Sequence, residues 1–270
     1  MPGPFENFRH SYWKNAKPIF VPNAFGEELG RKLKRKIARR YTFDKFIFHF
    51  KEGSHVVALH RHRKNAFFCR VDLSRFFYSI KRNRLKRILK DIGIPKPEYY
   101  AKWSTVKNPF EGGGYVLPYG FVQSPILATL ILSESPIGTY LRALPDAIAP
   151  SVYMDDLCLS GQDQAALKQA FDGLVASVAE AGFTLNDEKT REPAAKIDIF
   201  NCSLENGNTA VLPGRIDEFF AEDHEDAAVA SFQTYVDIVQ SKTWRIGDSK
   251  KRRRKAFEQW RKKAAAAPAA

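Results

Sequence analysis

The pattern of apolar and polar positions predicts regular elements along most of the chain. Between Ala24 and Arg40, apolar residues recur at every fourth position from Phe25, which predicts a helix with one buried stripe. Seven of the ten residues from Arg31 to Arg40 are basic, so the solvent face of this helix is strongly positive. The same reasoning predicts helices over residues 83–92, 126–132, 163–181, 215–240 and 250–263.

Short runs of β-prone residues predict the strands. The run 67–72 is apolar and ends in a carboxylate, and 151–160 resembles two apolar strands joined by a tight turn. A strand–turn–strand is expected over 46–59, turned at Gly53, and a further strand at Phe183. Together these elements predict an α+β fold with a split βαβ sheet, two helices covering one face and the other face open.

Two adjacent carboxylates, Asp155 and Asp156, occupy the predicted turn of 151–160. An unpaired carboxylate against a core costs several kcal/mol unless a cation or hydrogen bonds meet it. A solvated turn is the alternative, because Asp is common in turns. Asp72, at the end of another strand, adds a third carboxylate, which favours a cation-binding site.

The segment 117–125 precedes a fully apolar helical run. Gly120 permits close approach of the backbone at this point. Ser124 is predicted to be the N-cap of the helix and Pro125 its first residue.

These segments, in this order, resemble the palm of reverse transcriptases. Asp72 falls in motif A, the segment from Gly120 to Pro125 in motif B and the Asp155–Asp156 pair in motif C. Residues 182–190 resemble motif D, with Lys189 in the place of the family's lysine, and 197–204 resemble motif E, the primer grip. The similarity extends from about Phe67 to Leu204, roughly half the chain.

The resemblance implies a right-hand polymerase fold of fingers, palm and small thumb, with a ferredoxin-like palm sheet. We expect an N-terminal segment and reduced fingers over 1–66 and a palm over 67–204, within which 83–118 form a fingers-side helix and loop. A small basic helical thumb is expected over 205–263, followed by a disordered tail over 264–270.

The implied reaction adds dNTPs to a primer 3′-OH on an RNA template. Asp72, Asp155 and Asp156, with the carbonyl of Leu73, would hold two Mg²⁺ ions about 3.5–4 Å apart, with Mn²⁺ as a substitute. Lys189 would protonate or neutralise the pyrophosphate. Phe77 would exclude a 2′-OH as a steric gate. The full set expected to bind the dNTP is Lys51, Phe77, Tyr119 and Gly120.

Composition favours a polyanionic partner. The net charge of +13 and the excess of 43 Lys and Arg over 30 Asp and Glu suit RNA and DNA through counterion release. The residues expected to contact nucleic acid are Ser124, Pro125, Lys250, Lys251, Arg252, Arg253 and Arg254.

The three cysteines form neither an even disulfide framework nor a metal motif, which predicts buried thiols. With no secretory pattern or apolar run of about 18 residues, a cytoplasmic protein without membrane contact is expected.

The short chain resembles bacterial retron and phage-defence reverse transcriptases, although the Asn-Ala-x-x-His and Val-Thr-Gly signatures of retrons are missing. This implies antiviral defence with a structured non-coding RNA, and leaves open a partner protein or homo-oligomer. Two alternatives remain: template-independent or protein-primed DNA synthesis, and a nucleic-acid-binding subunit with a catalytic partner. Three clustered carboxylates argue against an inactive palm, because they repel one another without metal.

Overall fold

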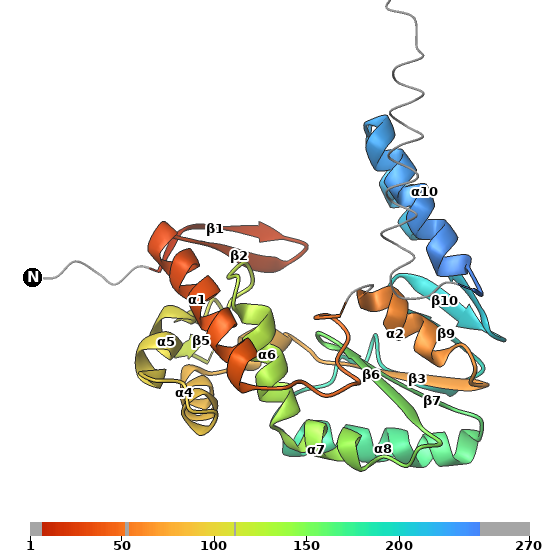
Figure 1. Cartoon of the computed structure of the whole chain (residues 1–270), viewed down its shortest axis with the longest axis horizontal. Helices are drawn as coiled ribbons and strands as arrows, with labels where there is room; N and C mark the ends of the chain where they lie inside the picture. The colour runs from red at the N-terminus through yellow and green to blue at the C-terminus, as the bar shows by residue number, and fades with distance from the viewer. Residues whose placement is uncertain (1–6, 52–53, 111, 244–270) are drawn as a thin grey trace, which may run out of the picture. The chain divides into compact units, whose positions relative to one another are not determined.

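The fold is given by a computed structural model, which describes residues 7–51, 54–110 and 112–243 (Figure 1). The chain divides into two compact units. The first comprises residues 1–45, 73–144 and 173–186, and the second comprises 46–72, 145–172 and 187–270. The expected division into fingers, palm and thumb stays a prediction. The helix expected at 250–263, its basic run 250–254 and the tail 264–270 lie outside the described residues.

In the first unit, the predicted helix 24–40 is confirmed as α1 (Ala24–Arg40). The side chain of Asn23 caps it by accepting a hydrogen bond from the Gly26 N–H at 2.7 Å. The apolar stripe is buried at Leu33 and Ile37, whereas Phe25 is 51% exposed. The stripe therefore leaves the core near the start of the helix.

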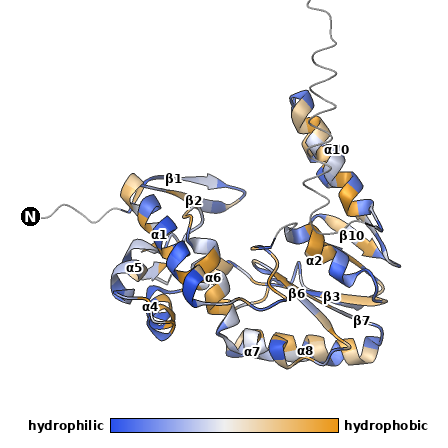
Figure 2. Cartoon of the chain, viewed as in Figure 1, coloured by the Kyte–Doolittle hydropathy of each residue, from blue (hydrophilic) through white to orange (hydrophobic). Residues whose placement is uncertain are grey.

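The other helices of this unit include α6 (Ser124–Ser133), whose residues 126–133 are all buried. Figure 2 shows α6 as predominantly hydrophobic, as expected for a helix enclosed on every side. The remaining elements are β1 (Phe8–Lys14), β2 (Lys17–Pro22), α3 (Phe76–Ser79), α4 (Arg82–Asp91), α5 (Pro97–Trp103), β4 (Val106–Lys107), β5 (Tyr115–Val116) and α7 (Pro136–Ala143). Helix α4 confirms the prediction for 83–92.

The second unit is built on an antiparallel sheet with strand order β6-β7-β3-β8. Its strands are β6 (Ala149–Tyr153), β7 (Asp156–Gly161), β3 (Phe67–Asp72) and β8 (Arg191–Ala194). The predicted strand 67–72 and the predicted hairpin within 151–160 are both confirmed. A second, three-stranded sheet of order β11-β10-β9 contains β9 (Lys196–Ile199), β10 (Cys202–Glu205) and β11 (Asn208–Val211).

Three predicted strands are wrong, the two of the strand–turn–strand over 46–59 and the one at Phe183. Residues 54–62 form helix α2 (Ser54–His62), which buries Val56, Leu59 and His62 along one face, and 46–50 contribute only a bridge between Ile47 and Val152. A short apolar run fits both periods, and here the helical period is the one that reaches the core. Phe183 lies outside any strand and packs on Phe76, with ring centroids 5.4 Å apart.

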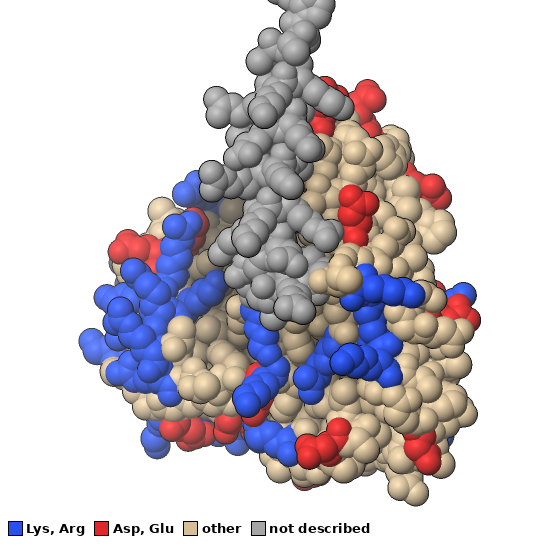
Figure 3. All heavy atoms as spheres, turned by 45° about the vertical axis from the view of Figure 1, so that its right-hand side comes forward, with Lys and Arg blue, Asp and Glu red and all other residues tan. Residues whose placement is uncertain are grey.

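The remaining helices follow the prediction more closely. Helix α8 (Gln164–Glu180) matches the expected 163–181. The expected helix 215–240 is present as two helices, α9 (Pro213–Phe220) and α10 (Asp226–Gln240). All three cysteines are free and buried, as predicted. Figure 3 shows Lys and Arg side chains gathered in groups on the face drawn. No helix among the described residues is long and apolar enough to cross a membrane.

Candidate active site

Strand register brings the predicted carboxylates together. In the β3–β7 ladder Asp72 lies directly opposite Asp156, and in the β6–β7 hairpin Asp156 lies opposite Tyr153. Met154 and Asp155 form the tip, where Met154 has φ of 60°, a left-handed conformation that non-glycine residues adopt at a cost. The end of β3 and the tip of the hairpin therefore lie at the same end of the sheet, where these strands stop.

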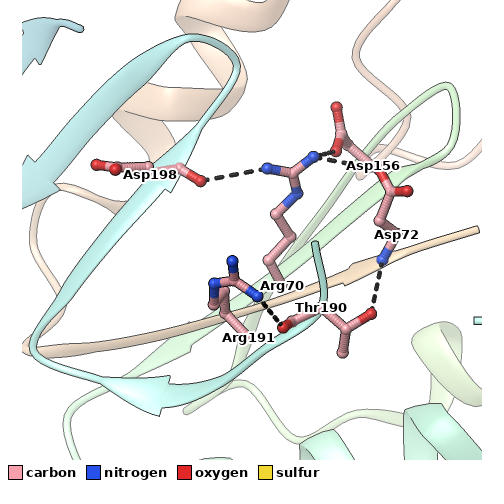
Figure 4. A network of polar contacts seen from close by, with 6 residues as sticks. All are labelled: Arg70, Asp72, Asp156, Thr190, Arg191 and Asp198. Atoms are coloured by element: carbon pink, nitrogen blue, oxygen red, sulfur yellow. Dashed lines mark hydrogen bonds and ion pairs between the residues drawn. The ribbon is translucent and has the colours of Figure 1, made fainter. Parts of the chain in front are cut away.

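Arg70 is the cation that meets these carboxylates. It lies two residues before Asp72 on β3, so both side chains project from the same face of the sheet. Its Nη2 is 3.2 Å from Asp72 Oδ2 and 2.5 Å from Asp156 Oδ1. Its Nη1 donates to the backbone carbonyl of Asp198 at 3.3 Å, while the Asp198 carboxylate points away (Figure 4). The Asp72 backbone N–H donates to Thr190 Oγ1 at 3.4 Å, which ties β3 to the residue before β8.

Asp156 is the most perturbed carboxyl of the site. Burial raises its pKa to about 6, and the neighbouring Asp155 and Asp72 charges add to the rise, whereas Arg70 opposes it. One guanidinium thus offsets only part of the cost of grouping three carboxylates. The negative charge that Arg70 leaves unbalanced favours binding of a further cation.

The carboxylates line a pocket of about 490 Å³ within the second unit. Lys189 lines the same pocket, so the structure brings together Asp72, Asp155, Asp156 and Lys189. The other lining residues are His55, Arg70, Tyr153, Phe200, Asn201, Arg215, Phe232 and Tyr235. Arg70 was missed by the sequence analysis, although the two-residue period of a strand places it beside Asp72.

His62 joins the two strands of the hairpin, β6 and β7. Its ring is fully buried on α2 and bridges the Ser160 and Ser151 hydroxyls, each 2.7 Å from a ring nitrogen. Burial lowers the pKa of His62 to about 3, and the Arg61 charge acts in the same direction. A neutral imidazole therefore links β6 to β7.

Carboxylate oxygens are the ligands that Mg²⁺ prefers. Among the described residues, no three His, Cys, Asp or Glu side chains lie close enough to hold a metal ion as they stand. The donor set still fits a divalent cation, because Asp156 Oδ1 is buried and accepts no well-aligned hydrogen bond there. Arg70 supplies the positive charge at this point, so its guanidinium and a metal ion would compete for the same oxygens.

The residues expected around the nucleotide sugar lie in the first unit. Phe77 is 2% exposed, and its ring packs on Tyr119 with centroids 4.4 Å apart. Phe76 and Tyr78 are buried as core residues. Tyr78 also packs on Tyr119, at 5.4 Å, and its hydroxyl donates to the Pro18 carbonyl. Phe77 is therefore one member of an aromatic cluster.

Gly120 has a structural reason to be glycine. Its φ is 100°, and an added Cβ would collide with the Phe20 carbonyl oxygen of β2. The adjacent Tyr119 carbonyl accepts a hydrogen bond from the Phe20 N–H at 2.9 Å. The contact with β2 alone thus accounts for glycine here, and the expected role of Gly120 in binding the dNTP stays a prediction.

Four further expected site residues, Ser124, Pro125, Leu73 and Lys51, are not among the residues that line the carboxylate pocket. Ser124 is the first residue of α6 and Gln123 its N-cap, so the predicted cap is one residue too late; Pro125 is the second helical residue. Gln123 extends the helix backwards because its own backbone is already helical, with φ of −90° and ψ of −14°. Leu73 forms an isolated antiparallel bridge with Leu185 in the first unit. Lys51 lies in the second unit, where its Nζ is 4.2 Å from the centre of the Phe48 ring.

Comparison with known proteins identifies the family. A model described as reverse transcriptase (RNA-dependent DNA polymerase) matches residues 13–200, more than half of the chain. The chain belongs to the reverse transcriptase family. The predicted polymerase fold of mixed α and β structure is confirmed by solved structures.

Those structures are distant in sequence. A foamy viral protease–reverse transcriptase in complex with double-stranded DNA has a TM-score of 0.51 at 14% identity, covering 92% of this chain and 42% of its own. Telomerase from Candida albicans, with a fragment of telomeric RNA, has a TM-score of 0.53 at 11% identity, covering 78% of this chain and 42% of its own. The chain thus spans less than half the length of either of these two proteins. No curated protein matches.

Proposed function

We propose that the chain is an RNA-directed DNA polymerase that adds dNTPs to a primer 3′-OH. The observation that carries the proposal is the strand register that sets Asp72 opposite Asp156, with Asp155 at the adjoining hairpin tip, in one pocket with Lys189. Three carboxylates and three cations, Arg70, Lys189 and Arg215, around about 490 Å³ suit phosphoryl transfer, in which charge on phosphate and metal must be balanced.

In this proposal Asp72, Asp155 and Asp156 hold two Mg²⁺ ions. When bound, these ions would supply a lowered pKa for the primer hydroxyl and neutralise the charge on the phosphates. Lys189 faces the same pocket and is the proposed proton donor or countercharge for the pyrophosphate. Before the ions bind, Arg70 holds the Asp72 and Asp156 carboxylates in place, with its guanidinium within 3.2 Å of both.

The proposed nucleotide is a dNTP, because a bulky ring at Phe77 leaves no space for a 2′-OH. The packing of Phe77 on Tyr119 supports this role, since a gate works only if its ring cannot yield. Tyr119 packs on that ring from the adjoining loop. Gly120 is a proposed contact to the dNTP, and Lys51 is the proposed contact to its triphosphate.

Primer extension tests the proposal. The purified chain, an RNA template with an annealed DNA primer, Mg²⁺ and labelled dNTPs should give DNA of the template's complementary sequence. Asp155→Ala should give none. Sequencing the product separates templated from untemplated or protein-primed synthesis. If the wild type makes no product but binds the primed template tightly, a subunit that needs a catalytic partner becomes the better account.

A narrower proposal is that this activity serves bacterial antiviral defence with a structured non-coding RNA. It rests on the resemblance to short bacterial defence enzymes. Cells that express the chain with its native flanking sequence should plate phage poorly, and Asp155→Ala should restore plating. RNA recovered with the purified chain should contain the sequence that templates the DNA product. Equal plating by both strains would refute the defence role and leave the polymerase proposal intact.

A further inference from the structure

A second hollow lies within the first unit, between α1 and α5. Its volume is about 530 Å³, within the range of sites that hold small molecules. Phe25 of α1 packs on Trp103 of α5 with ring centroids 4.7 Å apart, which joins the two helices. The residues that line this groove are Phe25, Glu28, Leu29, Lys32, Lys36, Pro95, Lys96, Tyr99 and Tyr100.

The groove carries uncompensated positive charge. Lys32, Lys36 and Lys96 line it, against one carboxylate, Glu28. Among the residues that the structure describes, none of the three lysines forms an ion pair, whereas Glu98 nearby is paired with Lys86. Lys32 and Lys36 lie one turn apart on the same side of α1, about 6 Å along the axis. The site therefore favours a ligand with repeated negative charge.

The same groove presents aromatic faces. Phe25 is 51% exposed and Tyr99 39% exposed, although both residues are large and apolar. Tyr99 is held by Tyr100 and Trp103, whose ring centroids lie 5.7 and 6.3 Å from its own. Supported but exposed rings beside lysines combine stacking with charge, the chemistry that binds unpaired nucleotides.

We propose that the α1–α5 groove is a binding site for single-stranded nucleic acid, separate from the carboxylate pocket. Lys32 and Lys36 contact successive phosphates along α1, and Lys96 contacts the strand from the α5 side. Tyr99 and Phe25 stack on unpaired bases. A duplex would not fit this chemistry, because its bases are already stacked on one another and unavailable to the rings.

Binding of a labelled oligouridylate, followed by fluorescence anisotropy without nucleotides or Mg²⁺, tests the site on the full chain. Lys32→Gln/Lys36→Gln should weaken binding about tenfold and reduce the slope of log K against log salt by about 1.4, since each single-strand phosphate contact contributes about 0.7. Tyr99→Leu keeps the apolar volume but removes the aromatic face, and should weaken binding about fivefold or more. The measurement needs no catalysis, so its failure is distinguishable from failure of the polymerase proposal.

A matched control lies on the same helix. Lys34→Gln/Arg35→Gln removes the same two charges, both from exposed residues that do not line the groove and form no ion pair among the described residues. It should leave affinity and salt slope close to wild type. Equal losses in the two double variants would overturn the proposal, because net charge alone would explain them. Displacement of the oligouridylate by polyglutamate as readily as by unlabelled RNA would also overturn it.

Discussion

The carboxylate pocket of the second unit and the aromatic cluster of the first are built by different means. Asp72 and Asp156 are placed by backbone pairing, because the β3–β7 ladder sets them opposite each other whatever their side chains do. Phe77 is placed by packing, since its ring is held by Tyr119 from a loop after β5. A substitution at Asp72 or Asp156 therefore changes one charge and leaves the backbone pairing in place, whereas a substitution at Phe77 also disturbs the ring that packs on it.

The two sites also differ in whether they leave charge unbalanced. In the pocket, burial and like charges raise the pKa of Asp156 to about 6, and Arg70 opposes only part of that rise. In the cluster, Phe77 is 2% exposed and its neighbours are apolar or aromatic. The pocket is therefore poised to bind a cation, whereas the aromatic cluster is already complete and can act only through its shape.

The largest effect should come from Asp72→Asn. Loss of one metal-binding carboxylate should lower the rate of primer extension about a thousandfold, equivalent to about 4 kcal/mol of transition-state stabilisation. Single-turnover extension measures it. The protein should stay folded, because Asn keeps the shape and removes one of three repelling charges. Asp198→Asn is the control, since its exposed carboxylate points away from Arg70, and it should keep nearly full activity. Equal losses in both variants would remove the special role of the β3 carboxylate.

Arg70→Gln should destabilise the metal-free protein by about 2 kcal/mol, because it leaves Asp72 and Asp156 without their cation at a site where Arg70 is 18% exposed. Added Mg²⁺ should stabilise this variant more than wild type, since the guanidinium no longer competes for the carboxylates. Urea unfolding with and without Mg²⁺ measures both changes. Arg191→Gln removes the same charge nearby, from an exposed side chain that donates to the Thr190 carbonyl, and should show neither effect.

The contrast also explains which features the sequence predicts. Period-two patterning and the position of Asp72 at a strand end suffice to place the carboxylates on one edge, and the ladder confirms it. The same period of two could have placed Arg70 beside Asp72. It could not predict helix α2, because a short apolar run is compatible with both the strand period and the helix period, and only contact with the core decides between them.

The β1–β2 hairpin shows a second limit. Its turn uses Asn15 and Ala16 with φ of 49° and 56°, and alanine gives no signal for a left-handed conformation. Pro18 and Pro22 lie within β2, and prolines within a run argue against a strand. They are tolerated because β2 pairs with a strand, β1, along one side only and is therefore an edge strand. The bridge to the loop at Tyr119 involves Ile19, which lies between the prolines. Long-range pairing of this kind leaves no trace in the local pattern.

The support of the hairpin by His62 should make stability depend on pH. The folded protein holds His62 neutral with a pKa of about 3, whereas the unfolded chain takes up its proton near pH 6.5. Stability is therefore complete above pH 6.5 and falls as the pH decreases, by about 2 kcal/mol at pH 5 from this group. His55 and His60, whose pKa values burial also lowers, act in the same direction.

Urea unfolding at pH 7.5 and pH 5 measures this dependence. His62→Gln keeps a hydrogen-bonding side chain between Ser151 and Ser160 but cannot titrate. Its loss of stability between the two pH values should be smaller than that of wild type by about 2 kcal/mol, even if it is less stable at both. An unchanged pH dependence would show that the imidazole is not held neutral in the fold.

The smallest effect, and the sharpest test of the aromatic cluster, is expected from Phe77→Val. A smaller side chain at the gate should reduce the preference for dNTP over rNTP about tenfold, in line with what a few methylene groups contribute to discrimination. Competition between the two nucleotides in primer extension measures the preference directly. Phe171→Val is the matched control, because Phe171 is also buried but lies on α8 in the second unit. Both variants open a cavity and lose stability, but only a gate changes the choice of sugar. If the two variants shift the preference equally, the ring of Phe77 acts as core alone, and the exclusion of ribose must come from another residue.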